Sequence, residues 1–308
     1  MKLENYFKNW KFWVFAVIVL LILAFVIANK FENPITVLDD VDSSQVTGEK
    51  GVAEVTESGW SIPVKLGFND IGWEDSSYIT RDGRYVLFFY HPTPSQFDKQ
   101  ATKDTGIDDG RIYSSKRPFV TKELHPVSKP GLPSDGGPYI AQNGDFYYMR
   151  TSFFRPLRIV RNGKVLNLGT GGEESNPHYC DAEEELYFDA PDGQKIAVYK
   201  NGKTTFLPEP INVADTQNFQ PFLVDGCQTM YFTSTRDATE GILPFQVYRS
   251  QRIGEFKWSG PELFLKYPGI GGVGEFSMTR DGKQIVFTQL ARDKDGVFRN
   301  NIYYTEKK

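Results

Sequence analysis

Carboxylate and amide side chains stand in front of five strand-like segments of this sequence. Two carboxylates about 5–10 Å apart are what the acid and the base or nucleophile of glycoside hydrolysis require. Carboxylates and amides also bind sugar hydroxyls and peptide groups, and an indole offers a surface for stacking. The candidate residues are Trp73, Glu74 and Asp75 in the first segment, Asp135 in the second, Glu174 and Asn176 in the third, Gln217 and Asn218 in the fourth, and Glu275 in the fifth.

Three interpretations of this set of residues stay open. The side chains could cap strand ends and do no chemistry, since buried polar groups need hydrogen-bond partners. They could form a binding mouth for a sugar, a peptide or a cation. They could also form the centre of a glycoside hydrolase or lyase, whose candidate acids are Glu74, Asp75, Asp135, Glu174 and Glu275. No motif assigns roles among these acids.

Other kinds of catalytic site find little support in the sequence. The only histidines, His91, His125 and His178, are scattered, which argues against a zinc site. No GxSxG motif is present, so Ser-His-Asp catalysis is not predicted. Two cysteines do not predict a disulfide framework. We expect Cys180 to be buried as a small apolar residue and Cys227, beside the turn residue Gly226, to be a candidate free thiol.

No cofactor and no metal are predicted for the chain. Asp293-Lys294-Asp295-Gly296 has two carboxylates and a glycine, as calcium loops do, but it lacks the other ligands of an EF-hand. Aspartate and glycine are ordinary turn formers, so a plain turn is the better interpretation. Residues 91–110 form a long loop, and loops of that length often carry function.

A degenerate repeat provides the strands that would position these residues. Each copy has a short strand, a tight turn and an aromatic strand. Its Asp-Gly and Asn-Gly pairs predict two-residue hairpins, because such turns need positive φ angles. The third copy has Ala182 in place of the glycine, so a different turn is expected there. The copies are SYITRDGRYVLFFY (77–90), PYIAQNGDFYYMR (138–150), PHYCDAEEELYFDA (177–190), PFLVDGCQTMYFTS (221–234) and FSMTRDGKQIVFTQ (276–289).

A third and a fourth strand follow most copies, which predicts five four-stranded blades. The last copy has no fourth strand before Lys308. Residues 59–67 (GWSIPVKLG) share a Trp-Ser-x-Pro core with the fourth strand at 256–264 (FKWSGPELF). We therefore predict that residues 59–67 complete the last blade and close the ring, which removes open sheet edges.

The repeat resembles that of TolB-like, WD-related β-propellers. The copy FSMTRDGKQIVFTQLARDKDG (276–296), followed by NIYY (301–304), is the most similar to the family motif. The resemblance covers about 250 residues and implies a propeller. It implies no single function, because that family contains binding modules, assembly proteins and peptidase accessory domains. In such a fold the first strand of each blade lines a central channel, so the candidate polar residues would converge on one mouth.

The N-terminus reads as a membrane segment. Residues 12–28 are an uncharged apolar run, nearly long enough to cross a bilayer as a helix. Lysines precede the run and acidic residues follow it, which places the rest of the chain outside the cytoplasm. We predict a cytoplasmic stub (1–11), one transmembrane helix acting as a signal anchor (12–29), a flexible linker (30–58) and an all-β, five-bladed propeller (59–308). A cleaved signal peptide is the alternative.

The predicted function follows from location and charge. The net charge is −4 without a basic block beyond the N-terminus, so nucleic acid is excluded as a partner. We predict a single-pass protein of the cytoplasmic membrane whose propeller, in the periplasm or outside the cell, binds a glycan or a protein partner at its acidic mouth. The alternative is a membrane-tethered glycoside hydrolase or lyase that uses carboxylates of the same mouth.

Overall fold

The computed structural model describes residues 51–92, 110–129, 134–152, 155–190, 195–237, 245–292 and 296–308. The predicted membrane anchor, residues 12–29, lies outside these ranges, as do the stub before it and the linker up to residue 50. Within the described ranges, no helix is both long enough and apolar enough to cross a membrane.

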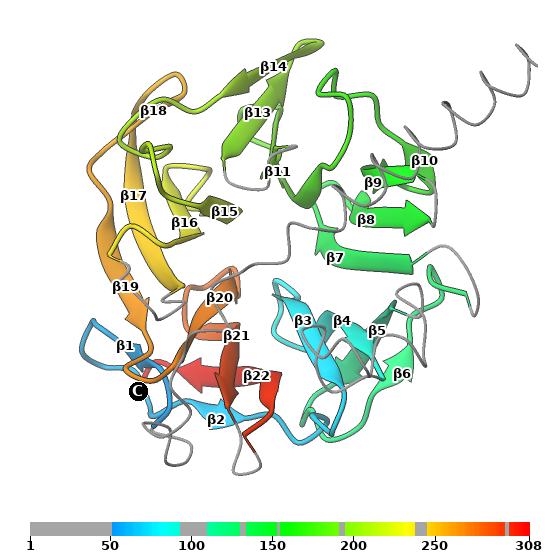
Figure 1. Cartoon of the computed structure of the whole chain (residues 1–308), viewed down its shortest axis with the longest axis vertical. Coiled ribbons are helices and arrows are strands. Elements are labelled where there is room, and N and C mark those ends of the chain that lie inside the picture. Colours follow the sequence, from blue (N-terminus) through cyan, green and yellow to red (C-terminus); the bar gives the residue numbers. More distant parts are fainter. Residues whose placement is uncertain are drawn as a thin grey trace, which may run out of the picture. The chain divides into compact units, whose positions relative to one another are not determined.

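The described part is an all-β propeller of five blades, each built on four antiparallel strands (Figure 1). The first strands of the blades surround the channel: β3 (Trp73–Ile79), β7 (Ser134–Ile140), β11 (Ser175–Cys180), β15 (Asn218–Val224) and β20 (Gly271–Met278). The second strands are β4 (Tyr85–His91), β8 (Phe146–Ser152), β12 (Glu185–Asp189), β16 (Thr229–Ser234) and β21 (Gln284–Arg292). Blades are numbered 1 to 5 in this order.

The outer half of each blade follows the same plan. The third strands are β5 (Arg111–Lys116), β9 (Arg155–Arg161), β13 (Ile196–Lys200), β17 (Gln246–Gly254) and β22 (Phe298–Glu306). The fourth strands are β6 (Glu123–Leu124), β10 (Lys164–Val165), β14 (Lys203–Phe206), β19 (Glu262–Lys266) and β2 (Val64–Lys65). Blade 4 carries two further short strands, β18 (Lys257–Trp258) against β17 and β1 (Glu54–Val55) against β19.

The N-terminal strand closes the ring as predicted. β2 pairs antiparallel with β22, the third strand of blade 5. Trp60 bridges Lys307, just as Trp258 pairs with Arg252 in blade 4, so the shared Trp-Ser-x-Pro core marks equivalent positions. Blade 5 therefore joins the beginning and the end of the propeller. Since β1 lies within residues 30–58, packing onto the propeller begins before residue 59.

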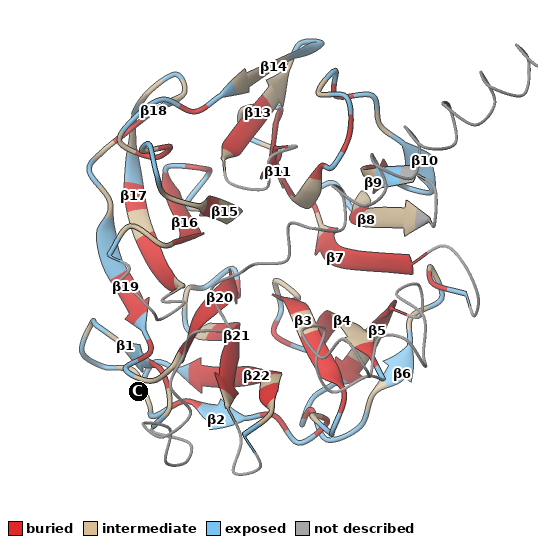
Figure 2. Cartoon of the chain, viewed as in Figure 1, coloured by how far each residue is buried: buried red, intermediate tan, exposed pale blue. Residues whose placement is uncertain are grey.

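Aromatic side chains explain why the second strands are buried. Each second strand has an aromatic residue at the same position, and this residue is at most 1% exposed in all five blades: Phe88, Tyr148, Phe188, Phe232 and Phe287. Fully burying one such side chain contributes roughly 1.5–3 kcal/mol. Figure 2 shows buried residues concentrated on the inner two strands of the blades. The aromatic bias of the sequence thus builds the blade interiors.

The hairpin turns between the first and second strands are longer than predicted. In blade 1, Thr80 N–H donates to the Tyr85 carbonyl at 2.8 Å, so the turn runs from Arg81 to Arg84 rather than over Asp82-Gly83 alone. The Asp82 side chain accepts from Thr80 Oγ1 at 2.7 Å and from Arg84 N–H at 3.1 Å. This side-chain bonding stabilises a wider loop. The two-residue hairpin prediction was therefore wrong.

Both cysteines differ from the sequence predictions. Cys180, at the end of β11, and Cys227, in the turn after β15, form a disulfide with a Cα–Cα distance of 6.0 Å. Cys227 is therefore not a free thiol, and Cys180 is buried as half of a cross-link between blades 3 and 4. The repeat could have predicted this disulfide, because it places both cysteines near the ends of the first strands of two neighbouring blades.

Candidate functional site

A β-bulge interrupts the first strand of every blade at the same register position. One residue in each bulge has a positive φ angle, between 46° and 57°. We call these five residues the bulge ring: Ser76, Gly137, Asn176, Gln220 and Glu275. Non-glycine residues in this conformation are strained, and such strain gathers at functional sites. The bulge ring lines a cavity of ≈ 50 Å³ at one end of the channel, which we call the acidic mouth.

The residues two positions before the bulge ring are held by contacts within and between blades. Each is at most 2% exposed. In blades 1 to 4 this position is polar and contacts a cation. The cation comes from the same blade for Glu74 with Lys122 (2.9 Å), Asp135 with Arg150 (2.6 Å) and Asn218 with Arg236 (3.0 Å), and from the neighbouring blade 2 for Glu174 with Arg158 (3.0 Å). Blade 5 has Val273 there. These four candidate residues therefore take part in contacts that hold the blades, and none of them lines the cavity.

We predict that Asp135→Ala lowers the free energy of unfolding by about 3 kcal/mol, because it removes one partner of a buried ion pair. Arg150 donates to both Asp135 oxygens, at 2.6 and 3.2 Å, and Ser128 Oγ donates at 3.1 Å. Urea unfolding measures the loss. The control is Glu262→Ala, which breaks the exposed pair with Arg249 and should cost less than about 1 kcal/mol. Equal losses in the two variants would contradict the buried role of Asp135.

Glu275 belongs to the bulge ring and is 8% exposed. Its Oε1 accepts from Gln220 Nε2 at 2.8 Å and from Ser76 Oγ at 3.3 Å. Its Oε2 is buried without a hydrogen-bond partner among the described residues. Burial, together with the charge of the neighbouring Asp75 carboxylate, raises the pKa of Glu275 well above the usual range. The raised pKa favours the protonated form of Glu275, and Oε2 can carry the proton because Oε1 already accepts two hydrogen bonds.

Asp75 lies beside Glu275 and is fixed by three donors. Its Oδ1 accepts from Ser76 N–H at 3.0 Å and from Asn300 Nδ2 at 2.9 Å. Its Oδ2 accepts from the Trp73 indole at 3.0 Å. Trp73 is only 4% exposed, so its ring offers no open face for a sugar. The role of Trp73 in this structure is to position the Asp75 carboxylate.

Asp189, at the end of β12, is a third carboxyl in contact with the bulge ring that sequence reasoning missed, although it does not line the cavity. Its oxygens accept from Gln220 N–H at 2.7 Å, from Asn176 Nδ2 at 2.7 Å and from Ser175 Oγ at 3.2 Å. Burial raises the pKa of Asp189 to about 7. Asp189 does not lie in a loop before a first strand, where the candidates were expected. It lies at the end of a second strand, and second strands end on this side of the propeller too.

We predict that Asp189→Asn flattens the pH dependence of stability between about pH 4 and pH 7. A carboxyl has a pKa near 4 in the unfolded chain, so the folded state binds the Asp189 proton more tightly and stability falls as pH rises through this window. Melting temperatures from pH 4 to 8 measure the slope. Asp82→Asn is the control, since the Asp82 pKa is lowered to about 2 and lies outside the window. Coincident native and Asp189→Asn curves would contradict the buried proton.

The two remaining candidates, Asn176 and Gln217, differ in whether they line the cavity. Asn176 lines the cavity as part of the bulge ring and donates to Asp189. Gln217 precedes β15, and its backbone N–H donates to Thr235 Oγ1 at 3.0 Å; it does not line the cavity. The structure thus places Asn176 and Glu275 at the acidic mouth, and Asp75 directly behind its wall, where it accepts from Ser76 N–H.

Metal ligands do not cluster within the described ranges. No group of three or more His, Cys, Asp or Glu residues there is placed to hold a metal ion. The calcium-like turn at 293–296 lies largely outside the described residues, and so does most of the long loop 91–110.

No protein-family model and no curated protein matches the sequence. Similar solved structures include a thermostable family-43 glycoside hydrolase, 13% identical with a TM-score of 0.47, the match covering 79% of this chain and 92% of that one. A GH43 endo-arabinanase from Bacillus licheniformis is 12% identical with a TM-score of 0.46, covering 77% and 95%. A protein of unknown function from Dyadobacter fermentans is 8% identical with a TM-score of 0.48, covering 83% and 99%.

At these identities and TM-scores the likeness says nothing about what this chain does. Without a matching family model, the resemblance to TolB-like repeats stays a prediction. What is established is the five-bladed architecture, and the function has to come from the acidic mouth itself.

Proposed function

We propose that the propeller acts on a glycan at its acidic mouth, as a glycoside hydrolase whose acid is Glu275. The observation that carries the proposal is the buried Glu275 carboxyl beside Asp75. Its Oε2 has no hydrogen-bond partner among the described residues, and its raised pKa favours the protonated form. A general acid needs a raised pKa of this kind, so that it still holds a proton at the working pH. Glu275 would donate its proton to the glycosidic oxygen as the C–O bond breaks, and Asp75 would stabilise the positive charge that develops on the sugar ring. Water would then add to that ring and give one proton to the Glu275 carboxylate, which restores the acid.

The surrounding residues support this proposal by holding the acid in place. Glu275 N–H donates to Gln220 Oε1 at 2.9 Å, and Thr233 Oγ1 donates to the same oxygen at 2.6 Å. Ser77 Oγ donates to the Glu275 carbonyl at 2.9 Å. A carboxyl fixed by its neighbours loses little rotamer freedom when it reacts, which is how active sites are pre-organised.

A second candidate function is glycan or protein binding without catalysis. It is favoured by the amide and hydroxyl members of the bulge ring, Ser76, Asn176 and Gln220, which can bond sugar hydroxyls or peptide groups. The ion pairs of Glu74, Asp135 and Glu174 also remove most of the predicted acids from the mouth, which leaves fewer groups for chemistry.

The experiment that separates the two functions incubates the full-length chain in detergent with a panel of polysaccharides. Release of new reducing ends supports the hydrolase. A rise in melting temperature with a polysaccharide that is not cleaved supports the binding module, because a ligand that binds only the native state stabilises it. Neither effect with any polysaccharide would contradict both proposals for a glycan ligand.

We also propose that the propeller lies outside the cytoplasm, anchored through residues 12–29. The support is the Cys180–Cys227 disulfide, since disulfides form and persist in oxidising compartments. The acidic mouth would then face glycans or proteins outside the membrane.

A further inference from the structure

A second cavity, of ≈ 250 Å³, lies at the opposite end of the channel, where the first and second strands are joined by their turns. We call it the turn cavity. Four rings line both this cavity and the acidic mouth: Tyr78, Tyr139, His178 and Phe222. They form a partition across the channel. The turn cavity is therefore a separate site, and nothing about it depends on the proposed hydrolase.

In every blade, the residue five positions after the bulge-ring residue lines the turn cavity. We call them the turn ring: Arg81, Gln142, Asp181, Asp225 and Arg280. Both cations come from blades 1 and 5, which are neighbours once the ring is closed. Both anions come from blades 3 and 4. The repeat thus places the two arginines on one side of the cavity.

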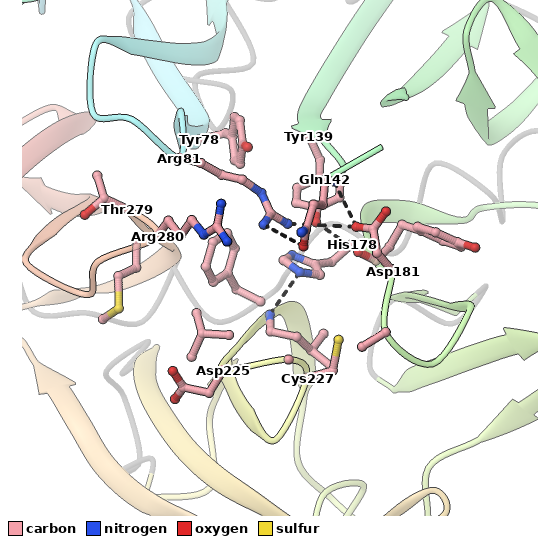
Figure 3. Close-up of a pocket in the computed structure, with 17 residues that line it drawn as sticks. Tyr78, Arg81, Tyr139, Gln142, His178, Asp181, Asp225, Cys227, Thr279 and Arg280 are labelled. Carbon is pink, nitrogen blue, oxygen red and sulfur yellow. Dashed lines mark hydrogen bonds and ion pairs between the residues drawn. The ribbon is translucent and has the colours of Figure 1, made fainter. Parts of the chain in front are cut away.

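The two arginines have few partners inside the protein. Figure 3 shows both side chains extending toward the middle of the cavity. Arg81 Nη1 donates to Gln142 Oε1 at a long 3.4 Å, and its Nη2 lies 3.9 Å from Asp181. Among the described residues, Arg280 makes no side-chain hydrogen bond or ion pair. Two guanidinium groups that face the same space repel each other unless an anion lies between them.

The acids of the turn ring do not supply that anion. Asp181 accepts from the backbone N–H groups of Gln142 and Asn143, at 2.8 and 3.1 Å. Asp225 accepts from Thr229 Oγ1 at 3.1 Å, on the blade-4 side of the cavity. Neither forms a close ion pair with an arginine. Asp181 therefore compensates Arg81 only weakly, and Arg280 forms no ion pair among the described residues.

One residue of the partition, His178, has a ring N–H that donates to no acceptor among the described residues. His178 is 4% exposed, and its Nε2 accepts from Leu223 N–H at 3.2 Å. The proton of the neutral ring therefore sits on Nδ1. That atom is buried and has no hydrogen-bond partner among the described residues. Burial and the charge of Arg81 lower the pKa of His178 well below its usual value, so the ring stays a neutral donor. A buried donor left unpaired is unfavourable, and a ligand that accepts its proton would remove that cost.

We propose that the turn cavity binds a small organic carboxylate. The carboxylate lies between Arg81 and Arg280, which supply charge-assisted hydrogen bonds, and the ligand also accepts the proton of His178 Nδ1. Guanidinium groups match the geometry of a carboxylate well. The charge of the two arginines distinguishes this ligand, an anion, from the glycan proposed for the acidic mouth.

The test uses the full-length chain in detergent, with succinate and acetate as probes and sodium chloride at matched ionic strength as the reference. At a probe concentration about 100 times its Kd, the melting temperature should rise by roughly 5–10 °C. Arg81→Gln/Arg280→Gln should abolish the rise. The matched control is Arg84→Gln/Lys283→Gln, which removes the same charge from the same two turns at residues that do not line the turn cavity.

The site is supported if the probe raises the melting temperature of the native protein and of Arg84→Gln/Lys283→Gln, but not that of Arg81→Gln/Arg280→Gln. No rise with either probe, an equal rise with sodium chloride, or a rise retained in Arg81→Gln/Arg280→Gln overturns it. Where the double variant does not fold, Arg280→Gln alone decides the question. Arg280 is exposed and has no partner among the described residues, so the fold should tolerate that change while the rise falls by at least half.

Discussion

Removal of the Cys180–Cys227 disulfide is expected to lower the free energy of unfolding by about 4 kcal/mol. The two cysteines are 47 residues apart, and a cross-link closing a loop of that length removes much of the entropy of the unfolded chain. Both residues lie in the buried contact between blades 3 and 4. That contact should therefore open first once the disulfide is lost. Urea unfolding of the full-length chain, native against Cys180→Ser/Cys227→Ser, measures the difference.

Reduction provides the internal control for this prediction. A thiol reductant should lower the urea midpoint of the native protein toward that of the double serine variant and leave the variant unchanged. If native and variant proteins unfold at the same midpoint under non-reducing conditions, the cross-link contributes nothing to stability. That result would also remove the support that the disulfide gives to a location outside the cytoplasm.

Glu275→Gln is expected to reduce glycan cleavage by 10²- to 10⁴-fold, the contribution typical of a general acid. Glutamine has nearly the same size and can still accept from Gln220 and Ser76, so the fold should be kept. Catalysis needs the protonated acid, so native activity should fall as pH rises through the raised pKa of Glu275. The variant should lose this limb of the profile. Initial rates of reducing-end release across pH 4 to 9 measure both effects.

Glu74→Gln is the matched control for the acid. Glu74 is also a buried glutamate of a first strand, and burial raises its pKa too. Its partner is Lys122, within blade 1, and it does not line the cavity of the acidic mouth. This variant should lose stability and keep the cleavage rate. A Glu275→Gln protein that cleaves at the native rate, or a Glu74→Gln protein that is equally inactive, would contradict the assignment.

Much of the architecture was predictable because the repeat has a physical cause. The alternation of aromatic residues around Phe88 and Phe287 marks buried second strands, and the shared core around Trp60 and Trp258 marks equivalent outer strands. The turn type was not predictable from Asp-Gly alone. The Asp82 side chain makes local hydrogen bonds that stabilise a wider loop.

The site was predictable only in part, because sequence does not show which way a side chain faces. Glu74 and Glu275 both lie in first strands. Glu275 is the bulge residue of its strand and lines the cavity, whereas Glu74 lies two residues before the bulge residue of its strand and contacts Lys122. A bulge has no fixed sequence signature, so this offset was invisible. Asp189 was missed because a second strand, and not a loop before a first strand, brings it to the bulge ring.

The measurement that tests the central claim most directly is the titration of Glu275 itself. Carbon-13 NMR of the full-length chain, labelled only at the glutamate carboxyl carbons, follows each group from pH 3 to 9, and Glu275→Gln and Glu74→Gln assign the two buried ones. The account predicts a resonance that titrates well above the usual glutamate range and disappears in Glu275→Gln. If that resonance titrates near pH 4 with the exposed glutamates, Glu275 holds no proton to donate, and the proposed hydrolase is wrong.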